Sequence, residues 1–466
     1  MSFQMNRTEE PVLAVENLRT TFFTDKETIR AVDDISYDIH EGETVGIVGE
    51  SGSGKSVTAR SIMGLIESPG RVMGGSIRFR HAETVDRLAA QYPKRTVDVA
   101  DLRERHDTVD LVQRLFDEGV TAGELTDGRH EDATAEGLVR EGHVDMRDLV
   151  EGGYTTRLGI TSEKAFVVRD GDDSYVEVTN MPKEGLRRMR GSGIAMIFQD
   201  PLTSLNPVYT VGNQIKEAIR LHQGLTGKAA TDEAIRLLEA VSIPDARRRI
   251  DEYPHQFSGG MRQRAVIAMA LACQPELLIC DEPTTALDVT IQAQILELLE
   301  EIQEERGLSI MFITHDMGVI AEIADRVNVM YAGELVESAP VDVLFENPKH
   351  PYTQGLLESI PSRNVGKERL RTITGDVPTP NEKPTYCRFA PRCPEAFDAC
   401  EAVHPVNVDV SETEADHTAA CLLYPEDMTR EDAVAFHRQK GGETATVGTG
   451  TVGGNGRGSS EVNDDE

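Results

Sequence analysis

The sequence predicts an α/β fold organised around a phosphate-binding loop. Residues 44–48 form an apolar run typical of a buried strand, the glycine-rich loop 49–56 follows it, and a helical pattern continues over 57–66. The loop reads Gly-Glu-Ser-Gly-Ser-Gly-Lys-Ser and fits the pattern GxxxxGK(S/T). A strand, such a loop and a helix in this order place backbone N–H groups around phosphate oxygens at a helix start.

Further strands are expected on both sides of this unit. Residues 12–48 are rich in strand patterns, and 74–79 form a short strand after the helix. Residues 277–282 are a second buried-type strand, which ends in the carboxylates of Asp281 and Glu282. Because burying an unpaired charge is costly, two acids at the end of an apolar strand indicate a functional site more than a solvated turn.

The composition excludes several classes of protein. The chain has 466 residues, of which 39% are hydrophobic, so two or three domains with a core are expected. We expect no membrane span, because the apolar run 265–273 is far too short. We expect no signal peptide, because the N-terminus has no apolar core behind a basic start. The net charge of −32 disfavours nucleic-acid binding. It is typical of a salt-loving cytoplasm, where salt screens surface repulsion, although an acidic protein of an ordinary cell is the alternative.

Phosphate chemistry follows from the two motifs taken together. In the loop, Lys55 would reach the β- and γ-phosphates of a nucleotide, and the Ser56 hydroxyl would bind Mg²⁺. At the end of the second strand, Asp281 would hold Mg²⁺ through water, and Glu282 would polarise the attacking water as a general base.

A third motif, Phe-Ser-Gly-Gly-Met-Arg-Gln-Arg at 257–264, opens a helical run and is a second anion-binding helix start. One nucleotide does not need both helix starts from a single subunit. The pair therefore predicts a head-to-tail dimer in which each subunit supplies this motif to the nucleotide of the other.

With these motifs in this order, the chain resembles the ATP-binding subunits of ABC transporters, and most closely those of the dipeptide and oligopeptide importer branch. The resemblance covers about 12–80 and 181–425. It is carried by the three motifs above and by the segments DPLTSLNP, PHQFSGGMRQR, DEPTTALDVTIQAQIL and ENPKHPYTQGLL. It implies a P-loop NTPase fold of the ABC ATPase type, with a RecA-like core, an antiparallel β subdomain and a helical signature subdomain.

The resemblance also implies roles for individual residues. Gln199 would bridge Mg²⁺ and the lytic water, and His315 would contact the γ-phosphate and hold the water with Glu282. Mg²⁺ would be held by Ser56, Gln199 and Asp281. The ATP-binding residues would be Gly49, Glu50, Ser51, Gly52, Ser53, Gly54, Lys55, Ser56 and Val57, and those acting on the partner's nucleotide would be Ser258, Gly259, Gly260 and Asp288 of the loop Ala286-Leu287-Asp288.

Two positions depart from the pattern of the family or leave a choice open. The signature begins Phe-Ser-Gly-Gly-Met in place of Leu-Ser-Gly-Gly-Gln, which removes one polar group but keeps the serine and glycines. An aromatic side chain before the loop would stack on adenine, and the sequence offers Phe22 or Phe23, with Phe23 preferred and core packing as the alternative for either.

Four cysteines lie close together near the C-terminus. In a reducing compartment such a group suggests a metal more than disulfides. The gaps are wider than the two to four residues of most zinc sites, and Pro394 follows Cys393 as in many ferredoxins. Some ATPases of the resembling branch carry a 4Fe-4S cluster here, so a 4Fe-4S cluster, zinc and unligated thiols all stay open. The cysteines are Cys387, Cys393, Cys400 and Cys421.

The expected domain organisation has five parts. Within the acidic insertion, helical spacing is expected near 109–116 and a hairpin over 165–179, turning at Asp170 and Gly171. The parts are 1–80 and 180–345 for the ATPase domain, 81–179 for a small α+β insertion, 346–425 for a C-terminal domain with the cysteines, and 426–466 for a disordered tail rich in acid and glycine.

The function implied by the resemblance is ATP hydrolysis that powers import of dipeptides or oligopeptides. The partners would be two transmembrane permeases, a second ATPase subunit in a heterodimer and an extracellular solute-binding protein, with this chain on the cytoplasmic face of the cell membrane. Nickel chelates or oligosaccharides are alternative cargoes. A soluble ABC ATPase acting on ribosomes or DNA is disfavoured by the single P-loop and the absence of heptads, and intact Lys55, Glu282 and His315 argue against an inactive regulatory subunit.

Overall fold

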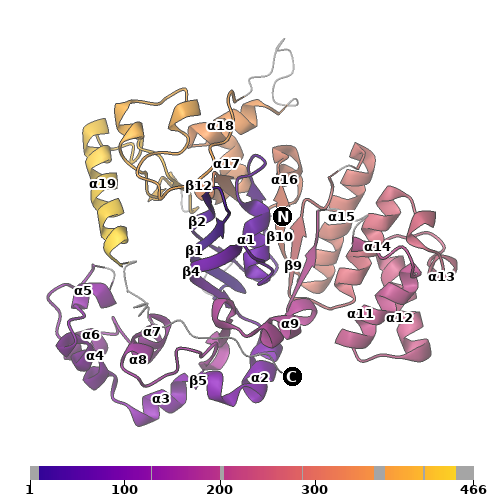
Figure 1. The fold of residues 1–466 in the computed structure, drawn as a ribbon, viewed down its shortest axis with the longest axis horizontal. Helices are drawn as coiled ribbons and strands as arrows, with labels where there is room; N and C mark the ends of the chain where they lie inside the picture. The colour runs from indigo at the N-terminus through magenta and orange to yellow at the C-terminus, as the bar shows by residue number, and fades with distance from the viewer. Residues whose placement is uncertain are drawn as a thin grey trace.

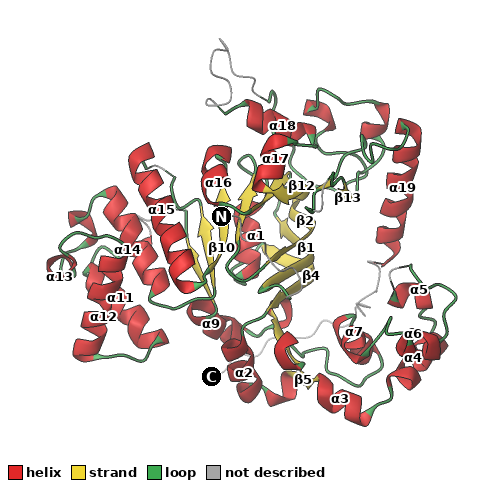
Figure 2. Cartoon of the chain, turned by 180° about the vertical axis from the view of Figure 1, so that it is seen from behind, coloured by secondary structure: helices red, strands yellow, loops and turns green. Residues whose placement is uncertain are grey.

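The computed structural model describes residues 10–126, 128–199, 204–285, 287–360, 373–412 and 415–447, with side chains described to residue 441. Within them, the strands form two sheets (Figures 1 and 2). One has the order β13-β14-β12-β11-β3-β10-β9-β8, and the other has the order β2-β1-β4-β7-β6-β5. None of the described helices is long and apolar enough to cross a membrane.

The larger sheet is built on parallel strands that are buried on both faces. β10 pairs in parallel with β3 and β9, β9 pairs with β8, and β3 pairs with β11. Side chains of β9 alternate between two cores, so that Leu277 and Ile279 enter one while Leu278 and Cys280 enter the other. The strands are β3 (Thr44–Val48), β8 (Ile194–Ile197), β9 (Leu277–Asp281), β10 (Ser309–Thr314) and β11 (Arg326–Tyr331).

Helices lie around this sheet, and a group of helices stands to one side of it (Figure 1). The helix that follows the glycine loop, α1 (Lys55–Ile62), begins two residues earlier and ends earlier than the predicted 57–66. The other helices are α9 (Lys183–Ser192), α11 (Val211–His222), α12 (Gly227–Ala240), α13 (Ala246–Arg249), α14 (Gly259–Leu271), α15 (Val289–Arg306) and α16 (Met317–Ile323).

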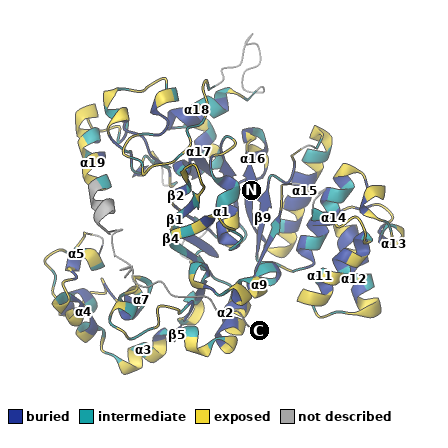
Figure 3. Ribbon diagram, in the orientation of Figure 1, coloured by how far each residue is buried: buried dark blue, intermediate teal, exposed yellow. Residues whose placement is uncertain are grey.

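The smaller sheet begins as the predicted antiparallel unit. β1 (Leu13–Phe23) pairs antiparallel with both β2 (Thr28–Ile39) and β4 (Gly70–Phe79). β4 is longer than the predicted 74–79, because the residues before Gly74 also pair with β1. Figure 3 shows that buried residues concentrate in these strands, whereas exposed residues predominate around α3, α4 and α5.

Residues 82–180 form an inner layer, which extends the smaller sheet, and an outer layer of helices. β7 (Tyr175–Glu177) pairs with β4, and β6 (Val167–Arg169) and β5 (Thr96–Asp98) continue the sheet. α2 (Ala82–Gln91) adds Val85 and Leu88 to the core of the smaller sheet. The outer layer packs on a separate apolar cluster, which also includes Val168 of β6 and Tyr175 of β7. This layer consists of α3 (Val99–Arg105), α4 (Thr108–Asp117), α5 (Ala122–Leu125), α6 (Ala135–Arg140), α7 (Met146–Glu151) and α8 (Tyr154–Arg157).

The predicted helix near 109–116 and the hairpin of 165–179 are both confirmed, by α4 and by the antiparallel pairing of β6 with β7. The expectation that all of 81–179 lies outside the ATPase core is wrong, because the inner layer completes a sheet and a core that begin at β1.

The C-terminal elements extend the larger sheet. β14 (Thr418–Ala419) pairs with β12 (Glu334–Pro340) and with β13 (Val408–Asp409). α17 (Val341–Glu346) and α18 (Pro351–Glu358) lie beside them (Figure 1).

The expectation of disorder from residue 426 onward is wrong for 430–447. These residues form α19 (Arg430–Val447), whose start is capped by the Thr429 hydroxyl accepting from the Asp432 N–H. Ala433 and His437, one helical turn apart, are buried against the domain. Residues 448–466 lie outside the described residues.

Candidate nucleotide-binding and catalytic site

The glycine loop links β3 to α1, and the path of its backbone requires glycine at two positions. Gly54 precedes α1 with φ 105°, and a Cβ there would lie 2.3 Å from the Ala31 carbonyl oxygen. A Cβ on Gly49 would lie 2.1 Å from the Met330 carbonyl oxygen. The loop is thus pressed against two neighbouring strands, which fixes its path at the start of α1.

Lys55 lies inside this loop with 5% of its surface exposed. Its ammonium donates to the carbonyl oxygens of Gly49 at 2.7 Å and Glu50 at 2.9 Å. Burial lowers the pKa of Lys55, and the carboxylates of Glu282 and Asp281 act in the opposite direction. A cation held in the concavity of a glycine loop suits the β- and γ-phosphates of a nucleotide.

Ser56 and Asp281 meet where the loop faces the end of β9. The Ser56 hydroxyl donates to Asp281 Oδ1 at 2.8 Å. Burial raises the pKa of Asp281, and the hydrogen bond from Ser56 opposes the rise. A hydroxyl and a carboxylate are the oxygen donors that Mg²⁺ prefers, so the pair fits the predicted metal position.

Glu282 is the centre of a second group of polar side chains. Its carboxylate accepts hydrogen bonds from Gln199 Nε2 and from the Thr285 hydroxyl, each at 3.0 Å, and lies 3.4 Å from His315 Nδ1. Burial alone would raise the pKa of Glu282, but the hydrogen bonds from Thr285 and Gln199 outweigh it and lower the pKa. The carboxylate is therefore ionised at neutral pH and able to accept a proton.

The backbone of Glu282 is also unusual, since φ is 49° in a residue other than glycine. Its N–H donates to the Ile313 carbonyl oxygen of β10 at 2.9 Å, which holds the turn after β9. Such left-handed backbone is costly and concentrates at functional sites. The structure thus brings together four predicted residues from the ends of β8, β9 and β10: Gln199, Asp281, Glu282 and His315.

The signature residues and Asp288 do not join this group within the chain. Ser258 accepts from the Met261 N–H as the N-cap of α14, and Asp288 accepts from the Ile291 N–H as the N-cap of α15. Among the contacts of the described residues, none connects either one to the glycine loop, and Figure 1 shows α14 with α11, α12 and α13, away from α1. A Cβ on Gly259 would meet nothing within 4 Å, so this helix start is open. Ala286 lies outside the described residues.

The two candidate adenine-stacking rings differ in packing. Phe22 is partly buried, and a Cβ on Gly70 would lie 2.6 Å from its ring. Phe23 is 44% exposed at the end of β1 and therefore has a ring face available. The choice of Phe23 stays a prediction.

Three residues that contact the site had not been predicted from the sequence. Thr285 supports Glu282, as described above. The Tyr352 hydroxyl accepts from the Glu50 N–H at 2.9 Å, and the Arg392 guanidinium pairs with the Glu50 carboxylate. Thr285 lies in a quoted motif, whereas nothing local in the sequence connects Tyr352 or Arg392 to a loop some 300 positions away.

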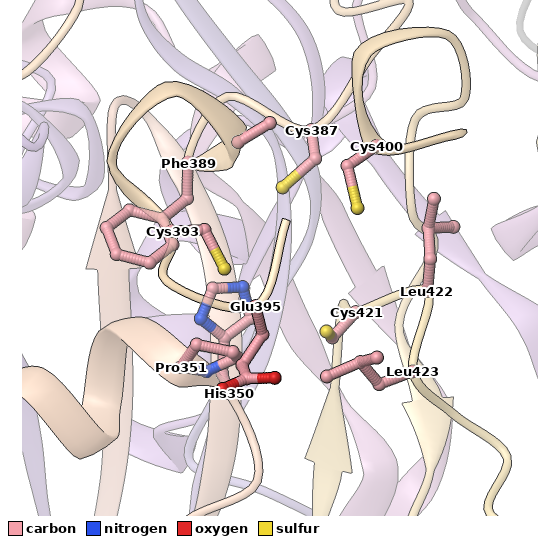
Figure 4. Close-up of a pocket in the computed structure, with 11 residues that line it drawn as sticks. His350, Pro351, Cys387, Phe389, Cys393, Glu395, Cys400, Cys421, Leu422 and Leu423 are labelled. Carbon is pink, nitrogen blue, oxygen red and sulfur yellow. The ribbon is translucent and has the colours of Figure 1, made fainter. Parts of the chain in front are cut away.

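The four C-terminal cysteines come together around one cavity (Figure 4). The cavity contains about 320 Å³ free of atoms, part of it open to solvent. Burial raises the pKa of the Cys387 and Cys421 thiols to about 12 and also raises that of Cys393. Over the described residues, no group of three or more His, Cys, Asp or Glu side chains is arranged to hold a metal ion.

Comparisons with known proteins give the family of the chain. Residues 32–147 and 171–285 match the family described as "ABC transporter", and residues 336–400 match "Oligopeptide/dipeptide transporter, C-terminal region". The first match runs past residue 80 into the block that we expected to lie outside the resemblance.

Two relatives from Brucella abortus are each 40% identical to the chain, and both are named for a proposed role as a peptide import ATP-binding protein. The alignments cover 90% of the chain and 98% of the first relative, and 85% of the chain and 91% of the second. A dimeric bacterial ABC transporter cassette is 20% identical with a TM-score of 0.46, covering 71% of this chain and 98% of the cassette. The two family matches and the relatives together show that this chain belongs to the ATP-binding subunits of ABC transporters, of the peptide import type.

Proposed function

We propose that the chain binds ATP with residues 49–57 and hydrolyses it with Glu282, Gln199 and His315 to power the import of dipeptides or oligopeptides. The observation that carries this proposal is the ionised Glu282 carboxylate, held by Gln199 and Thr285 beside the Ser56–Asp281 pair. A base and a metal-binding pair side by side at the carboxyl ends of parallel strands suit metal-assisted attack of water on a phosphate.

The chain's residues divide this work by position. The Lys55 ammonium neutralises negative charge on the β- and γ-phosphates. Ser56, Gln199 and Asp281 would hold Mg²⁺, which would offset the charge that develops in phosphoryl transfer. Glu282 accepts the proton of the attacking water at a carboxylate oxygen. Gln199 and His315 orient that carboxylate, and Phe23 offers its exposed ring to adenine.

The complete enzyme is a dimer in this proposal. The helix start formed by Ser258, Gly259 and Gly260, which is open at Gly259, would bind the γ-phosphate on a second ATPase subunit, and Asp288 would support that site. The assembly would contain two transmembrane permeases and a solute-binding protein, with this chain on the cytoplasmic face of the membrane. The ATPase rate of the assembly should rise when a solute-binding protein loaded with a dipeptide is added. Stimulation by a nickel chelate or an oligosaccharide in place of any peptide would overturn the cargo class.

The cysteine cavity is proposed to hold a 4Fe-4S cluster with a structural role. Four thiols from different parts of the C-terminal segment line one space. Four thiolates can bind either a 4Fe-4S cluster or one zinc ion, and the wide gaps between the cysteines and Pro394 after Cys393 favour the cluster. Without a metal the raised pKa values keep the thiols of Cys387, Cys393 and Cys421 protonated, so ligation would release protons. Zinc and free thiols are the outcomes that would replace this proposal.

A further inference from the structure

The acidic side chain of the glycine loop is bound by an arginine of the C-terminal part that contains the cysteines, residues 346–425, which we call the cysteine segment. Arg392 donates from both terminal nitrogens to the Glu50 carboxylate, at 2.6 Å to Oε2 and 3.0 Å to Oε1. The pair is bidentate, which is the strongest and most directional form of an arginine–carboxylate contact. Glu50 follows Gly49 directly, so this contact acts on the first turn of the phosphate-binding loop.

Arg392 is itself held rigidly. Only 4% of its side chain is exposed, and its remaining N–H groups donate to the carbonyl oxygens of Thr374 at 3.1 Å and Ile373 at 3.5 Å. Its guanidinium also contacts the Tyr331 hydroxyl at 3.3 Å. A guanidinium fixed on three sides loses little freedom when it binds a carboxylate, so the contact with Glu50 is preorganised.

Both contacts on Glu50 originate beside the cysteine cavity. Arg392 precedes Cys393, which lines the cavity, and Tyr352 follows His350 and Pro351, which also line it (Figure 4). The Tyr352 hydroxyl accepts a hydrogen bond from the backbone N–H of Glu50, while Arg392 binds the Glu50 carboxylate. The cysteine segment therefore holds both the backbone and the charge of the loop at this residue.

We propose that Arg392 is a positioning residue for ATP binding, which holds and neutralises Glu50 and so makes ATP affinity depend on the folded cysteine segment. The inference rests on the proposed ATP site. An unpaired Glu50 carboxylate would be a negative charge in a loop that must receive the phosphates, and it would repel them. Arg392 removes that repulsion and fixes the loop before the nucleotide arrives.

The test is a double-mutant cycle on the full-length protein, with MgATP binding measured by calorimetry. Arg392→Gln should weaken ATP binding about tenfold, since coupled charge pairs are typically worth that much. Arg392→Gln combined with Glu50→Gln should recover most of the loss, because the unpaired charge is then gone. Arg392→Lys should be intermediate, because it keeps the charge but not the bidentate contact. The KM for ATP should change more than kcat.

Arg388→Gln is the matched control. Arg388 is also buried in the cysteine segment, but it binds Asp33 of β2 at 2.6 Å in place of the loop. The Arg388→Gln variant should lower the melting temperature as Arg392→Gln does, but it should have a much smaller effect on ATP affinity. The inference is wrong if Arg392→Gln binds ATP like the wild type, if the double variant recovers nothing, or if Arg388→Gln weakens ATP binding equally.

Failure of the proposed function would give a different result, because the wild type itself would then bind ATP no better than Lys55→Ala.

Discussion

The Ser56 hydroxyl donates a hydrogen bond of 2.8 Å to the carboxylate of Asp281, 225 positions further along the chain. Ser56 is the second residue of α1, and Asp281 is the last residue of β9. β10 lies between β3 and β9 in the sheet, and all three run parallel, so their carboxyl ends share one edge. The topology of the sheet therefore brings together two oxygen ligands that neither motif contains alone.

Replacing Asp281 should weaken the use of Mg²⁺. Asp281→Asn keeps the shape of the side chain but removes its charge, and loss of a partner around a metal typically costs about 10- to 100-fold in metal affinity. A Mg²⁺ titration of ATP hydrolysis by the assembled transporter measures this. Asp316→Asn is the control, since Asp316 follows β10 and caps α16 through the Gly318 N–H. Equal Mg²⁺ dependence in the Asp281 variant and the wild type would remove Asp281 from the metal site.

Residues that share a local motif could be predicted from the sequence, and residues joined only by the fold could not. The glycine loop, the acids after β9 and His315 each stand in a recognisable local pattern. The pairing of Arg392 with Glu50 spans 342 positions, and no local sequence pattern indicates it. β5, β6 and β7 are three residues each, too short for strand periodicity to show that they extend the sheet of β4. The composition of 426–466, averaged over its length, also concealed the helical start at Thr429.

The outer layer of the insertion should be removable, but the whole block should not. Deleting 99–160 with a short Gly/Ser linker should leave ATP affinity unchanged, because α3 to α8 pack on a cluster that is separate from the two cores of the ATPase sheets and to which the inner layer adds only Val168 and Tyr175 among its buried residues. Deleting 81–179 should give insoluble protein, because it removes Leu88 and Phe166 from the core that contains Ile77 and Phe79. Loss of one large buried side chain alone costs about 3–5 kcal/mol. Calorimetry with ATP and size-exclusion chromatography compare the two deletions.

A soluble 81–179 deletion that binds ATP would show that the inner layer is dispensable. A 99–160 deletion that loses ATP binding while it stays folded would show that the outer layer takes part in the site.

The cysteines should give an iron signature. Protein purified without oxygen should be brown, with broad absorption at about 400 nm and about four irons per chain, as four thiolates on one cubane require. Cys421→Ser should lose the colour and loosen the C-terminal segment. Cys273→Ser is the control, because Cys273 lies at the end of α14, away from the cavity. Colourless protein with about one zinc would assign a zinc site, and four free thiols without metal would exclude both.

Acid should weaken the attachment of α19. His437 Nδ1 accepts from the Val406 N–H at 3.1 Å, and Nε2 lies 3.0 Å from the Tyr424 carbonyl oxygen, so the ring is neutral. Burial lowers the pKa of His437 below its ordinary 6.5, so the unfolded state binds more protons as the pH falls below 6.5. This contribution to stability is complete above pH 6.5 and is lost as the pH falls toward the folded pKa.

Denaturant midpoints at pH values of about 7.5 and 5.5 measure this loss. His437→Gln should show a smaller drop between the two values than the wild type, whereas His255→Gln, at an exposed position, should show the same drop as the wild type. An equal drop in the wild type and His437→Gln would mean that His437 does not carry the effect.

The central claim, that hydrolysis at Glu282 drives peptide import, is tested most directly by uptake of a radiolabelled dipeptide into vesicles that contain the assembled transporter and internal ATP. Glu282→Gln keeps the loop and Lys55 but lacks the base, whose loss typically costs about 10² to 10⁴ in rate. The account predicts that this variant binds ATP with wild-type affinity and imports no measurable dipeptide above vesicles without ATP. ATP-dependent uptake by the Glu282→Gln transporter at the wild-type rate would contradict it.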